Sequence, residues 1–292
     1  MSTTQTPTME RKQGPKYITV RFQGRLGNNM FQYASLIGIA QRNNLVAINN
    51  GDNHLNRVFK VKTVSWREYQ SLPFTTTYEE KHGCTFENAV FNLGTSENVM
   101  LNGYYQSWKY FADPITFKRL KRHDFQFVDN LRIRATLQFF RIILPKVRNY
   151  DGKVIYIAVH IRRGDMVHRE EYVRIGYTSP DIGYLNRAME KFRSLYKNCL
   201  FIIASDDIGW CHQTITSDDA VFLPNGNPPE LDMAILAQCD HTLMTVGSYG
   251  WWVAWLVGGT TIYYSGYPTP NSSLAEEFNS EDYRPQSWIG MT

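Results

Sequence analysis

The sequence predicts an α/β protein whose strands lie in parallel sheets. Three observations support this fold class. A strand, a glycine-containing loop and a helix follow one another near the start of the chain, continuous apolar runs recur after residue 150, and segments of helical periodicity separate those runs. Because 292 residues exceed the length of one average domain, we expect two domains.

The first expected element is a strand over residues 17–22, where apolar and polar residues alternate. The loop QGRLGNN follows at residues 23–29. Apolar residues then recur at helical spacing over residues 30–41. The order strand, glycine loop, helix is typical of the first unit of an α/β domain.

The middle of the chain carries a weaker signal. Residues 44–100 combine short strand-like pieces with polar turns, and we assign no element there, whereas residues 109–149 have helical periodicity. Pro145 and the segment 149–153 (NYDGK) mark a domain boundary. We therefore expect a flexible leader at 1–15, an N-terminal domain with the GRLGNN loop at 16–150, and a Rossmann-like C-terminal domain at 151–292.

The second half of the chain has the clearest pattern. Its apolar runs fit strands buried on both faces of a sheet, and the segments between them fit helices. This alternation predicts a doubly wound sheet. The expected strands span 154–161, 200–204, 220–223, 242–246 and 260–264, and the expected helices span 182–196, 229–239 and 251–257.

Charge and hydropathy indicate which kind of ligand the chain binds and whether it contains a membrane-spanning helix. The chain has 31 basic and 27 acidic residues, a formal net charge of +4. This mild excess suits an anionic small ligand better than a nucleic acid, which requires a denser basic surface. No apolar stretch approaches the ~20 residues of a membrane-spanning helix, and the polar N-terminus has no apolar signal core. The sequence predicts a chain that is soluble as given.

The four cysteines form no metal-binding pattern. Cys84, Cys199, Cys211 and Cys239 include no CxxC pair. We expect buried thiols or one or two disulfides, and no metal site.

Polar or glycine-rich clusters follow four of the expected strands where each strand ends. In an open parallel sheet, the carboxyl ends of the strands form the ligand-binding edge. We therefore expect the four clusters to meet in one site. They are residues 24–28 (GRLGN), 160–165 (HIRRGD), 205–207 (SDD) and 247–250 (GSYG).

The arginine pair Arg162 and Arg163 is the most informative feature of these clusters. Two guanidinium groups beside a buried strand are costly unless an anion meets them. Arginine binds phosphate through two parallel hydrogen bonds. The alternative is a structural salt bridge, with Asp165 as the nearest carboxylate in the sequence. The position at a strand end, followed by Gly164, favours an anion site.

The other clusters fit the same ligand class. The glycines of GRLGNN allow backbone N–H groups to approach a phosphate at a helix N-terminus, although an ordinary turn explains them equally well. Asp206 and Asp207 accept hydrogen bonds from a base or ribose, or cap a helix. Gly247 and Ser248 offer close approach and a hydroxyl donor. No D-x-D metal-binding pair is present, so we expect arginines to neutralise a leaving diphosphate.

Together these motifs resemble those of the α-1,2-fucosyltransferases, glycosyltransferase family 11. The likeness runs from about residue 16 to residue 290 and is greatest with animal members at 237–264. It implies a GT-B-like fold, with two Rossmann-like domains facing across a cleft. It also implies inverting, metal-independent transfer of L-fucose from GDP-β-L-fucose to the 2-hydroxyl of a terminal galactose. The motifs are GRLGNNMFQYA (24–34), HIRRGD (160–165), ASDD (204–207) and TVGSYGWWVAWLVGG (245–259).

The resemblance also implies roles for single residues. Arg162 grips the donor diphosphate, Asp165 orients an arginine, and Glu170 is the expected general base. From the residues alone, His168, Glu171 and the nearer Asp165 are further candidates for the base, and the alternative for Glu170 and Glu171 is a solvated loop carboxylate. The N-terminal domain is expected on the acceptor side. The expected substrate-binding residues are Gly24, Arg25, Gly27, Asn28, His160, Arg163, Ser205, Asp206, Asp207, Gly247 and Ser248.

Two other functions remain open from the sequence. One is a sulfotransferase-like or other nucleotide-dependent transferase, although GRLGNN matches a phosphate-binding P-loop poorly. The other is an inactive glycan-binding protein of the same fold. The resemblance implies a Golgi location, while membrane attachment is not encoded in this chain. The expected partners are GDP-fucose and a galactose-terminated glycan, with no cofactor, no metal and no nucleic acid.

Overall fold

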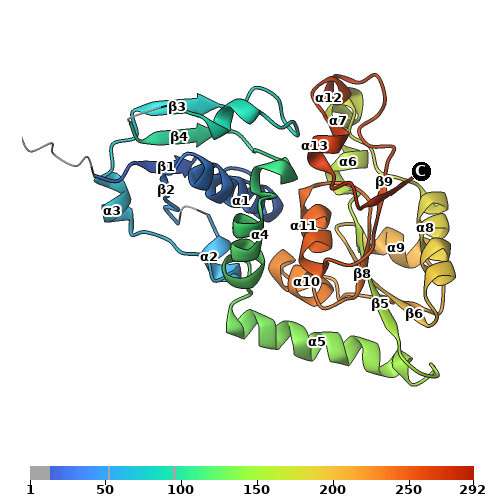
Figure 1. Ribbon diagram of the computed structural model, residues 1–292. Helices are drawn as coiled ribbons and strands as arrows, with labels where there is room; N and C mark the ends of the chain where they lie inside the picture. The colour runs from blue at the N-terminus through green and yellow to red at the C-terminus, as the bar shows by residue number, and fades with distance from the viewer. Residues whose placement is uncertain (1–13, 52, 95–96) are drawn as a thin grey trace, which may run out of the picture.

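The computed structural model describes residues 14–51, 53–94 and 97–292. It contains two α/β units side by side, each built around its own parallel sheet (Figure 1). The strands of one sheet all precede residue 150, and those of the other all follow it. The leader expected at 1–15 lies outside the described residues except for Gly14 and Pro15.

The N-terminal sheet has four parallel strands in the order β2-β1-β4-β3. Between β1 and β2 runs α1, most of which is buried because it packs between this sheet and the second unit. The first strand forms where apolar and polar residues alternate, but Thr19 is buried too and donates its hydroxyl to the Ile48 carbonyl (2.9 Å). The elements are β1 (Tyr17–Val20), α1 (Leu26–Arg42), β2 (Val46–Ala47), β3 (Thr76–Glu79) and β4 (Val99–Asn102).

The segment expected to be helical at 109–149 is divided into four helical pieces. Asp113 caps the second piece by accepting N–H groups of Ile115 and Thr116, and Pro114 occupies its first turn, where no N–H is needed. The last piece, α5, crosses to the second unit and packs against α10. The short elements are α2 (Leu55–Val58), α3 (Trp66–Gln70), η1 (Asn88–Phe91), η2 (Trp108–Phe111), α4 (Pro114–Arg119) and η3 (Leu120–Asp124), and α5 spans Asp129–Val147.

The C-terminal sheet has six parallel strands in the order β7-β6-β5-β8-β9-β10. Numbered within this sheet, the order is 3-2-1-4-5-6, which is that of a Rossmann fold. Successive strands are added on one side of β5 up to β7 and on its other side from β8 onward. The topological switch point therefore lies between β5 and β8, and the carboxyl ends of these two strands border the ligand crevice. The strands are β5 (Ile155–Ile161), β6 (Cys199–Ser205), β7 (Ala220–Phe222), β8 (His241–Met244), β9 (Thr261–Tyr264) and β10 (Ile289–Met291).

Helices cover both faces of this sheet. Successive strand residues point to opposite faces, so Ile157 and Val159 pack in the cluster that contains α8, while Ala158 packs in the cluster that contains α5, α10 and α11. The prediction of a doubly wound sheet is therefore confirmed. The helices are α6 (Gly164–His168), α7 (Glu170–Ile175), α8 (Ile182–Leu195), α9 (Ile208–Thr214), α10 (Pro229–Leu236), α11 (Ser248–Val257), α12 (Ser273–Glu276) and α13 (Ser280–Tyr283).

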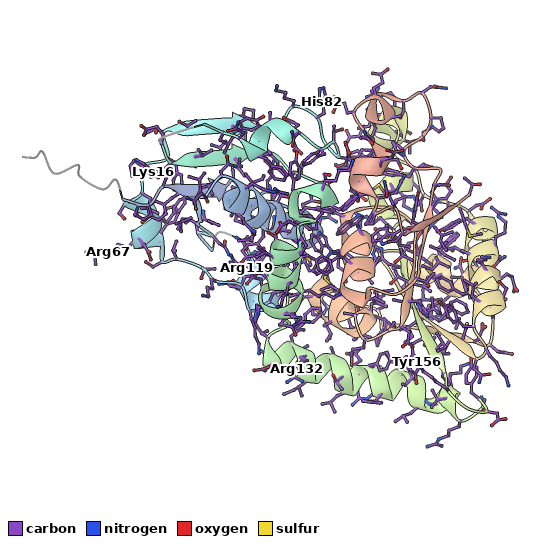
Figure 2. All side chains as sticks on the ribbon, in the orientation of Figure 1. Lys16, Arg67, His82, Arg119, Arg132 and Tyr156 are labelled. Carbon is purple, nitrogen blue, oxygen red and sulfur yellow. The ribbon has the colours of Figure 1, made fainter. Side chains whose placement is uncertain are left out.

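One hydrophobic core extends across the two units. The Phe31 ring of α1 lies 4.5 Å from the Trp251 ring and 5.1 Å from the Trp252 ring of α11, measured between centroids. Side chains fill the region between these helices (Figure 2). Both tryptophans are fully buried. The shared core holds the two units in one arrangement.

Two expectations change with the structure. The alternative of one or two disulfides is wrong, because Cys84, Cys199, Cys211 and Cys239 are all free thiols. The strands β2, β3, β4 and β10 had no assignment from the sequence. Within the described part of the chain, no helix combines the length and hydropathy needed to cross a bilayer.

Candidate active site

A cavity of about 1410 Å³ lies between the two units. The N-terminal unit contributes the start of α1, the helix α2 and two loops, at 83–84 and 104–106. The C-terminal unit contributes residues at and after the carboxyl ends of β5, β6, β7 and β8, together with part of the segment 267–283 that follows β9. The cavity therefore occupies the crevice at the switch point of the Rossmann-like sheet, closed on its other side by the first unit.

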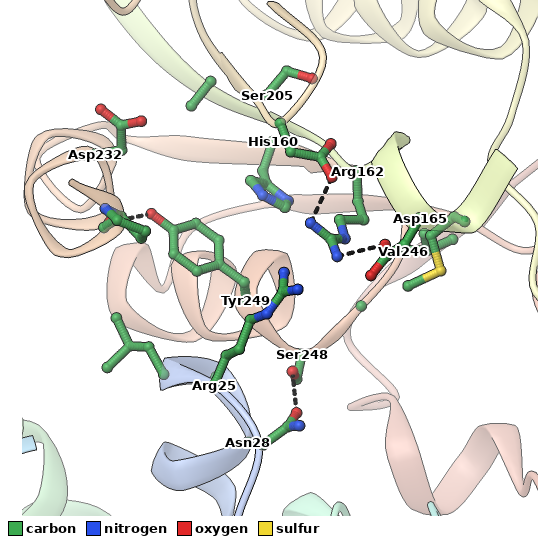
Figure 3. Close-up of a pocket in the computed structure, with 18 of the residues that line it drawn as sticks. Arg25, Asn28, His160, Arg162, Asp165, Ser205, Asp232, Val246, Ser248 and Tyr249 are labelled. Carbon is green, nitrogen blue, oxygen red and sulfur yellow. Dashed lines mark hydrogen bonds and ion pairs between the residues drawn. The ribbon is translucent and has the colours of Figure 1, made fainter. Parts of the chain in front are cut away.

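Two helices begin at this cavity, one from each unit. At Gly27, an added Cβ atom would lie 2.7 Å from the backbone of Ser248 and Tyr249, so only glycine allows α1 and α11 to approach this closely. The Ser248 hydroxyl donates a hydrogen bond to Asn28 Oδ1 across the junction (2.6 Å; Figure 3). Neither helix has a side-chain cap at its N-terminus. Their first-turn N–H groups therefore form a positive pole at the cavity wall, suited to an anion.

Arg162 stands at the end of β5, beside this pole. Its Nη1 donates to Asp206 Oδ2 and its Nη2 to Asp165 Oδ1, both at 2.5 Å (Figure 3). Its backbone N–H donates to Thr245 Oγ1 at 2.8 Å. The salt-bridge alternative is thus present, yet the side chain lines the cavity. A guanidinium has five N–H donors, so three remain for a ligand, held in a fixed orientation.

The two carboxylates outweigh the charge of Arg162. One guanidinium and two carboxylates sum to −1, so Arg162 directs hydrogen bonds but adds no net positive charge. Arg25 extends into the cavity in Figure 3, and among the described residues no carboxylate pairs with it. Arg25 and the two helix N-termini therefore supply the uncompensated positive charge for an anion.

His160 lies deeper in the cavity wall on β5. It is buried, its Nδ1 has no hydrogen-bond partner among the described residues, and its ring centroid is 4.7 Å from that of Tyr249. Burial, together with the charge of Arg162, lowers the pKa of His160 to about 3. The imidazole is therefore neutral at neutral pH, and it can offer hydrogen bonds but no charge.

The acidic loop after β6 is committed largely to internal contacts. Asp206 accepts from Arg162 and from the backbone N–H of Arg163 (2.8 Å). Asp207 caps α9 by accepting the Trp210 N–H (3.3 Å), and its own N–H donates to Ser205 Oγ (2.9 Å). The helix-cap alternative therefore describes Asp207, and Asp206 holds the arginine loop.

Two of the site residues expected from the sequence do not line the cavity. The Arg163 guanidinium lies over the Trp210 ring, 3.8 Å from its centroid, with its Nε 3.4 Å from Asp207 Oδ2. Glu170 is exposed at the start of α7. The expected residues that do line the cavity are Gly24, Arg25, Gly27, Asn28, His160, Arg162, Asp165, Ser205, Asp206, Asp207, Gly247 and Ser248.

The cavity also contains a carboxylate that the sequence analysis overlooked. Asp232 lies on α10, and burial raises its pKa to about 6 even though Asn227 Nδ2 donates to it at 2.8 Å. Asn227 is in turn held by Gln138 Nε2 (3.2 Å). The sequence PELD indicated the helix, but an acidic residue in a first turn is already favourable at a helix N-terminus. Only the cavity makes Asp232 a candidate binding residue. In the described ranges, no cluster of three or more metal-ligating side chains occurs.

The chain is similar throughout its length to one protein family. The family model Glycosyl transferase family 11 matches residues 2–292. The chain is 31% identical to Galactoside 2-alpha-L-fucosyltransferase Sec1 of Mus musculus, over 94% of this chain and 73% of that protein. It is 32% identical to Galactoside alpha-(1,2)-fucosyltransferase 2 of Bos taurus, over 94% of this chain and 78% of that protein.

Solved structures share the fold at lower identity. The fucosyltransferase NodZ from Bradyrhizobium superposes with a TM-score of 0.56 at 15% identity, covering 87% of this chain and 98% of that one. A mutant of Arabidopsis thaliana FUT1 in complex with GDP gives a TM-score of 0.56 at 12% identity, covering 88% and 72%. The predicted GT-B-like fold, with two Rossmann-like domains facing across a cleft, is confirmed.

Proposed function

Because the chain belongs to glycosyl transferase family 11, we propose that it transfers L-fucose from GDP-β-L-fucose to the 2-hydroxyl of a terminal galactose. The transfer inverts the anomeric carbon and gives an α-1,2-fucoside. One observation carries the proposal from the structure: the uncapped N-termini of α1 and α11 meet beside Arg162 in a cavity at the sheet's switch point. This is the arrangement that a nucleoside diphosphate requires.

The donor spans the cavity from α10 to the α1–α11 junction. Guanine presents N1–H and N2–H donors on one edge, and a carboxylate accepts both at once. Asp232 is a half-buried carboxylate in the cavity that can make this contact, with Asn227 fixing its orientation. The diphosphate then lies at the helix N-termini, within reach of Arg25 and the free N–H groups of Arg162.

The reaction needs stabilisation of the leaving group more than a strong nucleophile. The galactose oxygen attacks the anomeric carbon from the face opposite GDP, while the bond from that carbon to the β-phosphate oxygen breaks and its electron pair stays with GDP. Arg162, Arg25 and the two helix termini stabilise the negative charge that grows on the diphosphate. The proton of the galactose hydroxyl passes to a base.

Glu170 remains our proposal for that base. Because Glu170 does not line the cavity, its carboxylate can reach the acceptor hydroxyl only if its position changes. The helix α7 must move toward the cavity for the Glu170 carboxylate to reach the acceptor. We expect Glu170→Gln to lower kcat with little change in the KM for GDP-fucose. A variant that keeps most of its turnover removes Glu170 from the mechanism.

We propose metal-independent turnover, because arginine and helix N-termini supply the charge that a divalent cation would otherwise provide. Activity is expected to be the same with and without EDTA after exhaustive dialysis. A loss of turnover in EDTA that Mg²⁺ or Mn²⁺ restores would contradict this assignment.

A Golgi location stays a prediction from the family resemblance, tested by imaging the tagged chain in animal cells.

The function is tested by incubating the protein with GDP-fucose and lactose, lacto-N-biose or N-acetyllactosamine. We expect GDP release and a fucosylated product whose new linkage is α-1,2 by NMR. Binding of GDP without transfer to any galactoside would favour an inactive glycan-binding protein. Calorimetric binding of adenosine 3′,5′-bisphosphate in place of GDP would favour a sulfotransferase-like enzyme.

A further inference from the structure

We propose that one end of the cavity, lined by five aromatic side chains, is the subsite that binds the acceptor galactoside; this proposal rests on the function proposed above. We call it the aromatic end. It consists of Tyr104, Tyr172, Tyr177, Tyr267 and Phe278.

Four of the five rings form a connected wall, and Tyr104 lines the same cavity. The Tyr172 and Tyr177 rings stack with centroids 4.9 Å apart, the Tyr177 and Tyr267 centroids are 6.1 Å apart, and those of Tyr267 and Phe278 are 5.8 Å apart. Unlike the tryptophans of the core, none of the five is fully buried, and Tyr104 is 38% exposed. A row of partly exposed rings along a cavity is a ready surface for an apolar ligand face.

The aromatic end lies away from the carboxylate that we assign to guanine. Asp232 and Asp165 lie on opposite sides of Arg162 and His160 in Figure 3. The helices α6 and α7 lead from Asp165 to Tyr172 and Tyr177, and the Arg162 carbonyl accepts the Ser179 hydroxyl (2.7 Å), which ties this segment to β5. The aromatic end therefore borders the diphosphate position on the side where an acceptor must enter.

The loop that carries Tyr104 is held in a defined conformation. Both oxygens of Glu80 accept backbone N–H groups, from Tyr104 at 2.6 Å and from Tyr105 at 2.8 Å. Tyr105 has φ = 50° and Cys84, across the same end of the cavity, has φ = 53°. Non-glycine residues rarely adopt this left-handed conformation, and it persists where the surrounding structure enforces it.

Galactose suits this surface chemically. One face of the β-galactose ring carries the C–H groups of C3, C4 and C5, which pack on an aromatic ring. The axial 4-hydroxyl projects from the opposite face, and the equatorial hydroxyls point to the edges. Glu277 is exposed and lines the same end of the cavity, so its carboxylate can accept hydroxyl hydrogen bonds. The ligand class is a β-galactoside with a free 2-hydroxyl.

The test separates acceptor binding from donor binding. Tyr104→Ala and Tyr177→Ala are compared with Tyr177→Phe, which keeps the ring, and with the control Trp66→Ala, an exposed aromatic residue of α3 far from the cavity. We expect the alanine variants to raise the KM for lactose about tenfold. Their Kd for GDP, measured by calorimetry, should stay within about twofold of the parent. Tyr177→Phe keeps the ring and should raise the KM for lactose less than Tyr177→Ala does, whereas Trp66→Ala should behave like the parent.

Two results overturn the assignment. The first is an unchanged KM for lactose in both alanine variants. The second is a loss of GDP affinity equal to the loss for lactose, which would place the rings at the donor. Failure of the parent chain to bind GDP contradicts the proposed function instead, so the two failures are distinguishable.

A separate observation concerns the outer face of α5. Ile133, Leu137, Phe140 and Leu144 are 53%, 66%, 51% and 49% exposed and follow one another at intervals of four, three and four residues. They form one stripe along the helix, which we call the α5 stripe. The buried residues of α5 lie on its opposite side, and the helix runs along the lower edge of the molecule in Figure 1.

We propose that the α5 stripe docks on an anionic lipid surface. Arg134 and Arg141 are exposed beside the stripe, and the one acidic residue of α5, Asp129, already pairs with Lys60 (3.1 Å) and Arg132 (3.5 Å). Within the described ranges neither of these arginines forms an ion pair. A helix face with large apolar side chains and free arginines is typical of interfacial membrane binding. In an antiparallel pair of two α5 helices, Arg134 and Arg141 would face the same arginines of the second copy, which disfavours self-association.

Vesicle co-sedimentation tests this second proposal. The parent chain should bind vesicles with 30% phosphatidylserine and not vesicles of pure phosphatidylcholine. Leu137→Ser/Phe140→Ser should abolish binding, and Arg134→Gln/Arg141→Gln should weaken it about 30-fold. The control Leu195→Ser, at an exposed leucine on α8, should bind like the parent. Equal binding by all variants, or a dimer in light scattering that Leu137→Ser/Phe140→Ser dissociates, overturns the proposal.

Discussion

Arg162 has the most constrained side chain of the cavity. Two carboxylates hold its guanidinium, and Gly164 makes this possible, because a Cβ atom there would lie 2.4 Å from Asp206 Oδ2. A planar guanidinium can donate to both carboxylates and still direct N–H groups at a ligand, whereas an ammonium group cannot. The geometry of the group therefore matters as much as its charge.

Replacing Arg162 with lysine tests the fork. We expect kcat to fall by about 10²–10³, because lysine cannot bridge Asp165 and Asp206 while it donates to the diphosphate. Initial rates with saturating GDP-fucose measure the effect, and Arg67→Lys on α3 is a control outside the cavity. Normal turnover in Arg162→Lys would exclude the proposed role.

Asp232 predicts a pH dependence of donor binding. Its pKa is raised to about 6 by burial, and only the ionised carboxylate accepts two guanine donors. Below pH 6 the Asp232 carboxyl of the free protein must lose a proton before GDP binds. GDP affinity therefore decreases as the pH is lowered, by about tenfold at pH 5. Calorimetry from pH 5 to pH 8 measures this, together with the proton released.

The Asp232→Asn variant is the control for this pH profile. It should bind GDP more weakly at pH 8 and show a flat profile between pH 5 and pH 8. An unchanged slope in Asp232→Asn would assign the titration to another group.

At the scale of elements, the junction of α1 and α11 decides whether the site exists. The two helix N-termini meet because Gly27 leaves room for the backbone of Ser248, and the Asn28–Ser248 hydrogen bond fixes their register. Gln106 Nε2 donates to the same Asn28 oxygen at 2.9 Å. One side-chain oxygen therefore ties together two helices and a loop at the cavity wall.

Gly27→Ala should damage both stability and activity. The added methyl group meets backbone atoms, which cannot rotate away, so the helices must separate. We expect a loss of about 1–3 kcal/mol in the free energy of unfolding and weaker GDP binding. Denaturant titration and calorimetry measure the two effects. Gly209→Ala on α9, where nothing lies within 4 Å of the added Cβ atom, should be neutral for stability; equal behaviour of the two variants would contradict the packing argument.

At the scale of the whole molecule, the shared core predicts cooperative unfolding. The aromatic contacts between Phe31, Trp251 and Trp252 belong to a hydrophobic cluster that contains residues of both units. If one unit unfolded alone, the other unit would lose the apolar contacts that it makes across the shared core. We expect a single calorimetric transition for the whole chain. Two resolved transitions, one for each sheet, would show that the units unfold independently.

The sequence predicted the parts of the fold that local patterns encode. Strands β5, β6 and β8 and helices α1, α8 and α11 lie within a few residues of their expected positions, because each combines a long apolar or periodic run with clear ends. The strands β2 and β10 are two and three residues long and mostly exposed, so neither stands out as a buried apolar run. Their pairing depends on neighbours distant in the sequence, which no local window contains.

The candidate site divides in the same way. The sequence determined that its motifs follow strand ends, and therefore that most of the expected residues gather at one edge of a sheet. Only the tertiary structure decided that Arg162 lines the cavity while its neighbour Arg163 packs on Trp210. It also decided that Asp232 and the aromatic end line the same cavity as Arg162. The physical reason is that a strand end fixes where the backbone arrives, whereas the direction of each side chain depends on packing against segments far away in the chain.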